Sequence, residues 1–160
     1  MPEIICNTSP LQYLHQLGQL SLLPRLVGQI IVPAAVSREL AQGTLLGVDV
    51  PVLTGLSWVI ERSSGDSSSA SFASQLGAGE VAVLALALDS SDPLVILDDG
   101  LARHWAQRLG LPLRGTLGLL LDARRAGLVD EIRPLLDELQ RLGFRLDNGT
   151  RSTVLRMAGE

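Results

Sequence analysis

Short apolar segments alternate with helical segments along this chain, and this alternation constrains the fold more than any other feature. Strands are expected at residues 3–7, 29–32, 57–61, 93–97 and 113–114. The fourth of these segments is a near-continuous apolar run, which is typical of a strand buried on both faces of a parallel sheet. The alternation therefore predicts an α/β fold, in which helices cover both faces of one central parallel sheet.

The helical segments have recognisable beginnings and ends. Thr8, Ser9 and Pro10 supply a cap and a first-turn proline ahead of leucines at helical spacing, and this helix is expected to stop at Gly18. Further helices are expected at 20–27, 33–40, 77–88, 100–109, 117–126 and 130–142, with a last helical turn or two beyond Asn148. Residues 144–146 are expected to be extended.

The length of 160 residues corresponds to about one domain, so we expect a single domain over residues 1–160. Within it, residues 63–74 hold seven serines and are expected to form a flexible loop, and residues 130–160 a C-terminal helical extension. No apolar run is long enough to cross a membrane, and no basic stretch precedes an apolar one at the N-terminus. The single cysteine excludes an internal disulfide framework and a cysteine-based zinc site. We expect a cytoplasmic protein with no membrane partner.

The charged residues restrict the chemistry. All 13 basic residues are arginine, so the chain has no lysine for a phosphate-binding P-loop, a Schiff base or a lysine general base. The net charge is -4, whereas proteins that bind nucleic acid through charge alone are usually basic. If this chain acts on nucleic acid, a bound divalent cation is the obvious group to meet the phosphate.

Polar side chains follow the expected strands at their carboxyl ends. Asn7 ends the first strand, and Asp98 and Asp99 follow the fourth. Glu80 stands in the first turn of the helix that leads into the fourth strand, and Glu39 lies about two turns into the helix after the second. Ligands of such sheets bind at the carboxyl ends of the strands. Clustered carboxylates stay ionised only when a cation or proton joins them, and oxygen ligands suit Mg²⁺ or Mn²⁺.

Each acid also has a purely structural interpretation. Asp98 and Asp99 could cap the helix that follows them, Glu39 could lie on a solvated helix face, and Glu80 could simply favour a helix N-terminus. The joint placement of these residues favours the metal site over the separate structural roles.

Four motifs carry a resemblance to a known family. They are Cys6-Asn-Thr-Ser-Pro-Leu11, Gly79-Glu80 before an Ala/Leu helix, Leu94-Val-Ile-Leu-Asp-Asp99 with Ala102-Arg103, and Gly115-Thr-Leu-Gly118. Together with residues 115–144, they resemble the PIN-domain nucleases, and most closely the PIN-like branch named DUF3368. The similarity covers almost the whole chain.

This resemblance implies a single PIN-like domain with a parallel sheet of order 3-2-1-4-5. It also implies an acid cluster that holds one or two Mg²⁺ or Mn²⁺ ions and a metal-assisted hydrolysis of RNA. Many PIN proteins are toxins of toxin–antitoxin pairs and form homodimers, so the resemblance implies an RNA substrate and allows an antitoxin partner. The leucine-rich segments 117–121 and 135–142 also favour a homodimer.

The resemblance places site residues position by position. Asn7 stands where the family has its first aspartate, Glu39 at the second acid, Glu80 at the third, and Asp98 and Asp99 at the fourth cluster. It thereby implies Glu39, Glu80, Asp98 and Asp99 as catalytic residues, and Asn7, Glu80, Asp98 and Asp99 as metal ligands.

Three further residues are expected to support the site. The hydroxyl of Thr8 or Ser9 falls where a hydroxyl accompanies the first acid, and Arg103 could reach a phosphate or neutralise an acid. The departure from the family pattern is Asn7, whose amide carries no charge and therefore attracts a cation less strongly. A catalytically weak or inactive PIN-like module that binds RNA or protein is the alternative.

Two other site types match parts of the pattern. Gly77-Ala-Gly79-Glu-Val-Ala82 has the spacing of a dinucleotide fingerprint, but a serine-rich segment precedes it where a strand belongs. A phosphoacceptor receiver domain also places acids at strand ends, but it depends on a lysine that this chain lacks. The sequence therefore supports the dinucleotide site and the receiver domain less well than the PIN-like domain.

Overall fold

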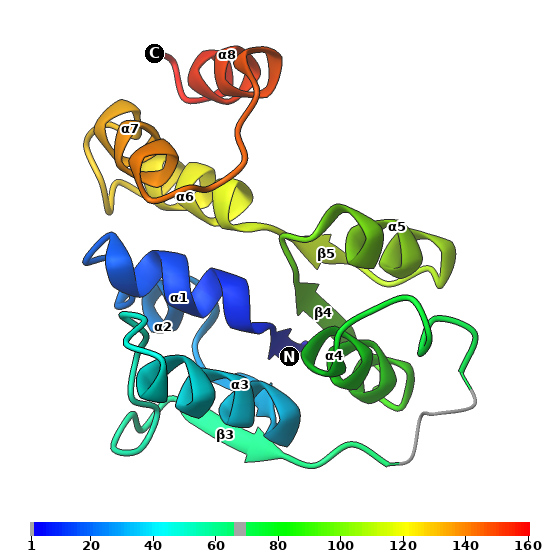
Figure 1. Cartoon of the computed structure of the whole chain (residues 1–160). Helices are drawn as coiled ribbons and strands as arrows, with labels where there is room; N and C mark the ends of the chain where they lie inside the picture. The colour runs from blue at the N-terminus through cyan, green and yellow to red at the C-terminus, as the bar shows by residue number, and fades with distance from the viewer. Residues whose placement is uncertain (1, 66–69) are drawn as a thin grey trace.

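The computed structural model describes residues 2–65 and 70–160, and its strands form one parallel sheet (Figure 1). The strands are β1 Glu3–Cys6, β2 Ile30–Pro33, β3 Val59–Arg62, β4 Pro93–Ile96 and β5 Leu113–Arg114. Their order across the sheet is β3-β2-β1-β4-β5. The expected α/β fold and strand order are confirmed.

Helices connect the strands and flank the sheet (Figure 1). They are α1 Thr8–Gln16, α2 Leu22–Val27, α3 Ala34–Leu45, α4 Ala78–Leu88, α5 Gly100–Arg108, α6 Thr116–Arg125, α7 Arg133–Arg141 and α8 Asn148–Met157. The chain passes outward from β1 through β2 to β3, and then returns to place β4 on the other side of β1. The strand order therefore reverses between β1 and β4, which is where open α/β sheets bind ligands.

The central strands are the most buried part of the sheet. Ile5 of β1, Ile30 of β2 and Ile96 of β4 are almost completely removed from solvent. In contrast, the edge strand β3 is mostly exposed and begins two residues later than expected. The buried centre holds the carboxyl ends of β1 and β4 in a rigid frame.

The C-terminal region is more helical than the sequence indicated. Instead of a turn or two, α8 is a ten-residue helix, because the side chain of Asp147 accepts the Thr150 N–H at 2.7 Å and caps its first turn. Residues 144–146 form no strand. At the end of the chain, the Glu160 carboxylate accepts the N–H groups of Ile132 and Arg133 at 2.8 and 3.1 Å, and so ties the C-terminus to the start of α7.

The leucine-rich helices pack inside the chain. Leu119 and Leu120 of α6 and Leu136 and Leu139 of α7 are all buried in the core. The apolar surface of these helices is therefore used within one molecule, and the homodimer stays a prediction.

Part of the serine-rich segment 63–74 can be described. Residues 66–69 lie outside the described residues, so the expected flexible loop is not described over that part. Phe72 is buried and meets the ring of Trp105 edge-on, with 6.0 Å between ring centroids. The C-terminal part of the segment is thus anchored on α5. None of the helices in the described part of the chain has the length and apolar character that a membrane crossing needs.

Candidate active site

Asn7 lies at the point where the strand order reverses. Its N–H donates to the carbonyl oxygen of Ile96 at 3.1 Å, which joins the ends of β1 and β4. The side chain is buried, with 5% of the residue exposed, and its Oδ1 has no hydrogen-bond partner in the described part of the chain. A buried amide oxygen without a partner costs free energy and is uncommon in folded proteins. This oxygen therefore has acceptor capacity that the described residues do not use.

Asp98 is held by three hydrogen bonds from two helices. The hydroxyls of Ser9 and Thr116 donate to its Oδ2 at 3.0 and 2.7 Å, and the Thr116 N–H donates to its Oδ1 at 2.7 Å. Burial raises the pKa of the neighbouring Cys6 thiol, and the charge of Asp98 adds to that rise. Asp98 thus joins the starts of α1 and α6 to the end of β4 in one fixed orientation.

Asp99 has a different role from its neighbour. It is exposed and caps α5, because its Oδ2 accepts the Ala102 N–H at 2.9 Å. The capping interpretation of the acidic pair is therefore correct for Asp99, whereas Asp98 bonds to α6.

Glu39 connects three helices through its two carboxylate oxygens. Oε1 accepts the Gly79 N–H at 2.8 Å, and Oε2 accepts the hydroxyl of Thr8. A Cβ at position 79 would lie 2.6 to 2.9 Å from three atoms of this carboxylate, so the contact requires glycine there. Both oxygens of Glu39 are therefore bonded within the fold, and it does not lie on a solvated helix face, while its catalytic role stays a prediction.

The pKa of Glu80 lies above its ordinary value. Burial raises its pKa, the charges of Asp99 and Glu39 raise it further, and the Gly77 N–H, which donates to its Oε2 at 3.0 Å, opposes the rise. The charges of Asp99 and Glu39 disfavour the ionised form of Glu80 because these carboxylates lie near it. The acids that are distant in sequence therefore share one region.

Arg103 neither pairs with an acid nor points freely into solvent. Its Nη1 donates to the carbonyl oxygen of Leu97 at 3.1 Å, and no ion pair joins it to Asp98 among residues 2–65 and 70–160. Sequence reasoning gave no role to Thr116, which is fully buried and supplies two of the three hydrogen bonds to Asp98. The motif at residues 115–118 contained it, but only the fold shows its partner.

The donor set suits a hard divalent cation. Over the described ranges, no group of three His, Cys, Asp or Glu side chains is already gathered closely enough to hold a metal ion. Asn7 nevertheless keeps an Oδ1 without a partner among the described residues, and the two residues that follow it, Thr8 and Ser9, donate to the carboxylates of Glu39 and Asp98. Oxygen ligands are those preferred by Mg²⁺ and Mn²⁺. Both oxygens of Glu39 and both of Asp98 already accept hydrogen bonds, whereas in the described part of the chain Glu80 and Asp99 each accept one at a single oxygen. Among the predicted ligands, Asn7, Glu80 and Asp99 therefore keep an oxygen for an ion, and Asp98 has only a further lone pair to offer.

Comparison with known families decides the classification. A family model described as DUF3368, PIN domain, matches residues 3–160. The chain belongs to this PIN-domain family. No curated protein and no solved structure matches it. PIN domains have a nuclease-type fold and generally use divalent metals.

The raised pKa of Glu80 predicts how the metal-free PIN domain responds to pH. The folded protein holds the Glu80 proton to higher pH than the unfolded chain, whose carboxyl has its ordinary pKa near 4.5. The free energy of unfolding therefore falls as the pH rises from the unfolded-state pKa of Glu80 to its folded-state pKa. Below the unfolded-state pKa, Glu80 is protonated in both states and makes no pH-dependent contribution. Glu80→Gln removes this loss.

In EDTA, the melting temperature of Glu80→Gln should exceed that of the wild type at about pH 7, and the difference should shrink towards about pH 4. Thermal melts at both pH values check this, with the exposed Glu131→Gln as the control. An advantage of the same size at both pH values would contradict the assigned cause.

Proposed function

We propose that this PIN domain is a metal-dependent endoribonuclease that hydrolyses RNA phosphodiester bonds with Mg²⁺ or Mn²⁺. The observation that carries the proposal is the buried Oδ1 of Asn7, which lacks a partner in the described part of the chain and lies where β1 and β4 end. Support also comes from Asp98, which follows β4 and is bonded to Ser9 of α1, and from Glu80, whose pKa is raised in part by the charges of Asp99 and Glu39.

The oxygens of Asn7, Glu80, Asp98 and Asp99 would hold the ion. Bound there, Mg²⁺ or Mn²⁺ supplies Lewis-acid polarisation of the phosphodiester and a more acidic water. The rest of the work belongs to the side chains. Their geometry has to be present before substrate arrives, because preorganised groups cost no rearrangement during the reaction.

The hydrogen bonds of the site provide that preorganisation. Asp98 is oriented by Ser9 and Thr116, and Glu39 holds the hydroxyl of Thr8 against the N-terminus of α4. Burial raises the pKa of Glu80 in the metal-free protein, and we assign this carboxyl as the group that accepts a proton from the attacking water.

A second candidate function is an RNA- or protein-binding module that does not cleave. It is favoured by Asn7, since the amide contributes no charge where a carboxylate would attract the cation. The influence of the Asp99 and Glu39 charges on Glu80 favours the nuclease, because it indicates that these acids lie near one another.

A cleavage assay on single-stranded and structured RNA separates the two functions. We expect cutting in Mn²⁺ or Mg²⁺ and none in EDTA. Equal traces of cutting in both conditions would show a contaminant and support the binding module.

Asn7→Asp tests the position where this chain departs from the family pattern. Because residue 7 is buried, an added carboxylate should destabilise the metal-free protein by about 1–3 kcal/mol. The same charge should strengthen Mn²⁺ binding by about tenfold, which corresponds to about 1.4 kcal/mol. Thermal melts over a Mn²⁺ titration measure both effects.

The matched control is Asn148→Asp, an identical change at an exposed residue of α8. It should leave the Mn²⁺ dependence of the melting temperature unaltered. If both variants respond to Mn²⁺ as the wild type does, Asn7 does not face the ion.

Family membership supports a further set of proposals: a toxin role, an antitoxin protein as partner, a homodimer and a cytoplasmic location. The homodimer also gains support from exposed apolar side chains near the end of α3, where Leu45 and Leu46 are 82% and 72% exposed. Sedimentation should give twice the mass of one chain. A species with the mass of one chain at every concentration would contradict the homodimer.

A further inference from the structure

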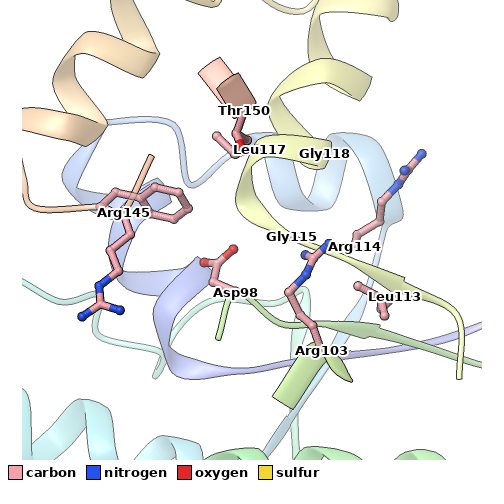
Figure 2. Close-up of a pocket in the computed structure, with 10 residues that line it drawn as sticks. Asp98, Arg103, Leu113, Arg114, Gly115, Leu117, Gly118, Arg145 and Thr150 are labelled. Atoms are coloured by element: carbon pink, nitrogen blue, oxygen red, sulfur yellow. The ribbon is translucent and has the colours of Figure 1, made fainter. Parts of the chain in front are cut away.

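A cavity of about 310 Å³ is lined in part by Asp98 (Figure 2). Its charged lining consists of one acid, Asp98, and three arginines, Arg103, Arg114 and Arg145. The chain as a whole carries a net charge of -4, so this excess of positive charge runs against the overall balance. A pocket of this size is large enough for part of a small ligand or one unit of a polymer.

Arg103 forms the inner part of the cavity. Figure 2 shows its side chain reaching toward Gly115, with the Asp98 carboxylate beside it. A Cβ at position 115 would collide with the Arg103 guanidinium, so glycine at this position leaves room for it. The bond to the Leu97 carbonyl uses one nitrogen of the guanidinium, and the others remain as donors.

Arg114 and Arg145 lie at the rim, on opposite sides of Asp98 in Figure 2. Both are exposed, and Arg145 makes no ion pair or hydrogen bond within the described ranges. Arg114 contacts Asp122 at 3.1 Å, but both side chains are partly exposed, so this pair is weak and exchangeable. Two guanidinium groups are thus available at the mouth of the cavity.

We propose that this cavity is a subsite for an RNA phosphate that neighbours the phosphodiester at the acids. The inference rests on the proposed function, because that function brings an RNA strand to Asp98. Asp98 belongs to both the cavity and the acid region, so the two sites are contiguous. The planar guanidinium group donates two parallel hydrogen bonds to phosphate oxygens, which makes arginine well suited to this ligand.

The apolar part of the lining is compatible with the same occupant. Leu113, Leu117 and Phe144 contribute to the walls, and the half-buried Phe144 offers a ring against which a sugar or base can pack. An inorganic anion has no apolar group that could pack against these side chains.

The test is the binding of a short fluorescent single-stranded RNA in EDTA, where no metal is present. Arg145→Ala and Arg114→Ala should each weaken binding about five- to tenfold. Each should also reduce the slope of log affinity against log salt by about 0.7 between about 50 and 200 mM salt, the value for one phosphate contact on a single strand. Arg145→Lys keeps the charge and should keep most of the slope.

The matched control is Arg25→Ala, which removes an exposed arginine of α2 outside the cavity. It should bind RNA within about twofold of the wild type. The proposal is overturned if Arg145→Ala and Arg25→Ala behave alike, or if the wild type binds no RNA. It is equally overturned if inorganic phosphate at the RNA concentration displaces the strand, or if a polyglutamate peptide binds as tightly and with the same dependence on Arg145.

Failure of this inference can be told apart from failure of the nuclease. RNA binding that depends on Arg145, with no cutting in Mn²⁺, would keep the subsite and reject the nuclease. Metal-dependent cutting, together with an RNA affinity that does not change in Arg145→Ala, would support the nuclease and reject the subsite.

Discussion

Glu80→Gln should lower metal-dependent RNA cleavage by about 10²–10⁴-fold, the range expected when a proton-transferring group is removed. The amide keeps an oxygen for the Gly77 N–H, so the N-terminal turn of α4 can stay intact. What is lost is a carboxylate that can hold the cation and take a proton. Initial cleavage rates in Mn²⁺ at matched protein concentrations measure the effect.

The control for this variant is Glu131→Gln, at an exposed residue just before α7. It should cut RNA at the wild-type rate. A wild-type cleavage rate in Glu80→Gln would show that Glu80 takes no part in the reaction. An equal loss of cleavage rate in Glu80→Gln and Glu131→Gln would indicate damage outside the site.

Asp98→Ala should reduce the free energy of unfolding by about 3–5 kcal/mol, measured by urea denaturation in EDTA. The change removes the acceptor of three hydrogen bonds and leaves the N–H and hydroxyl of fully buried Thr116 without a partner. Hydrogen bonds to a charged group are worth more than neutral ones, and unsatisfied buried donors add their own cost. Domains of this kind have about 5–15 kcal/mol of stability, so the variant should still fold.

Asp99→Ala is the matched comparison, since it removes the neighbouring carboxylate. Asp99 is exposed and caps α5 through one hydrogen bond, so its loss should cost only about 1 kcal/mol. If the urea midpoint of Asp98→Ala equals or exceeds that of Asp99→Ala, Asp98 does not anchor α1 and α6 to β4.

Several parts of the site could be anticipated from the order of residues. Asn7 and Asp98 follow apolar segments at the ends of central strands, and the carboxyl ends of parallel strands meet at one edge of the sheet. Glu80 opens a helix that begins with glycine, a pattern visible in the sequence. These expectations needed only strand direction and element boundaries.

Other parts could not be anticipated, because they depend on which atoms meet across the fold. Nothing near Glu39 in sequence indicates its bond to the Gly79 N–H, 40 positions away. In the sequence Thr116 only leads into a helix, and the fold shows that Asp98 accepts both of its donors. The position of Arg103 one turn past the acidic pair predicts contact with a phosphate or an acid, whereas its Nη1 donates to the Leu97 carbonyl.

By itself, the sequence determined the α/β class, the strand order implied by the family motifs, and the residues that end each strand. Periodicity and local capping, which are properties of neighbouring residues, indicate the fold class and the strand ends, whereas the strand order is implied by the resemblance to the family. Only the tertiary structure decided which carboxylates are already bonded, which amide oxygen lacks a partner, and that three arginines line one cavity next to Asp98. Hydrogen bonds, burial and charge act through space, so residues far apart in the chain acquire their roles only when folding brings their atoms together.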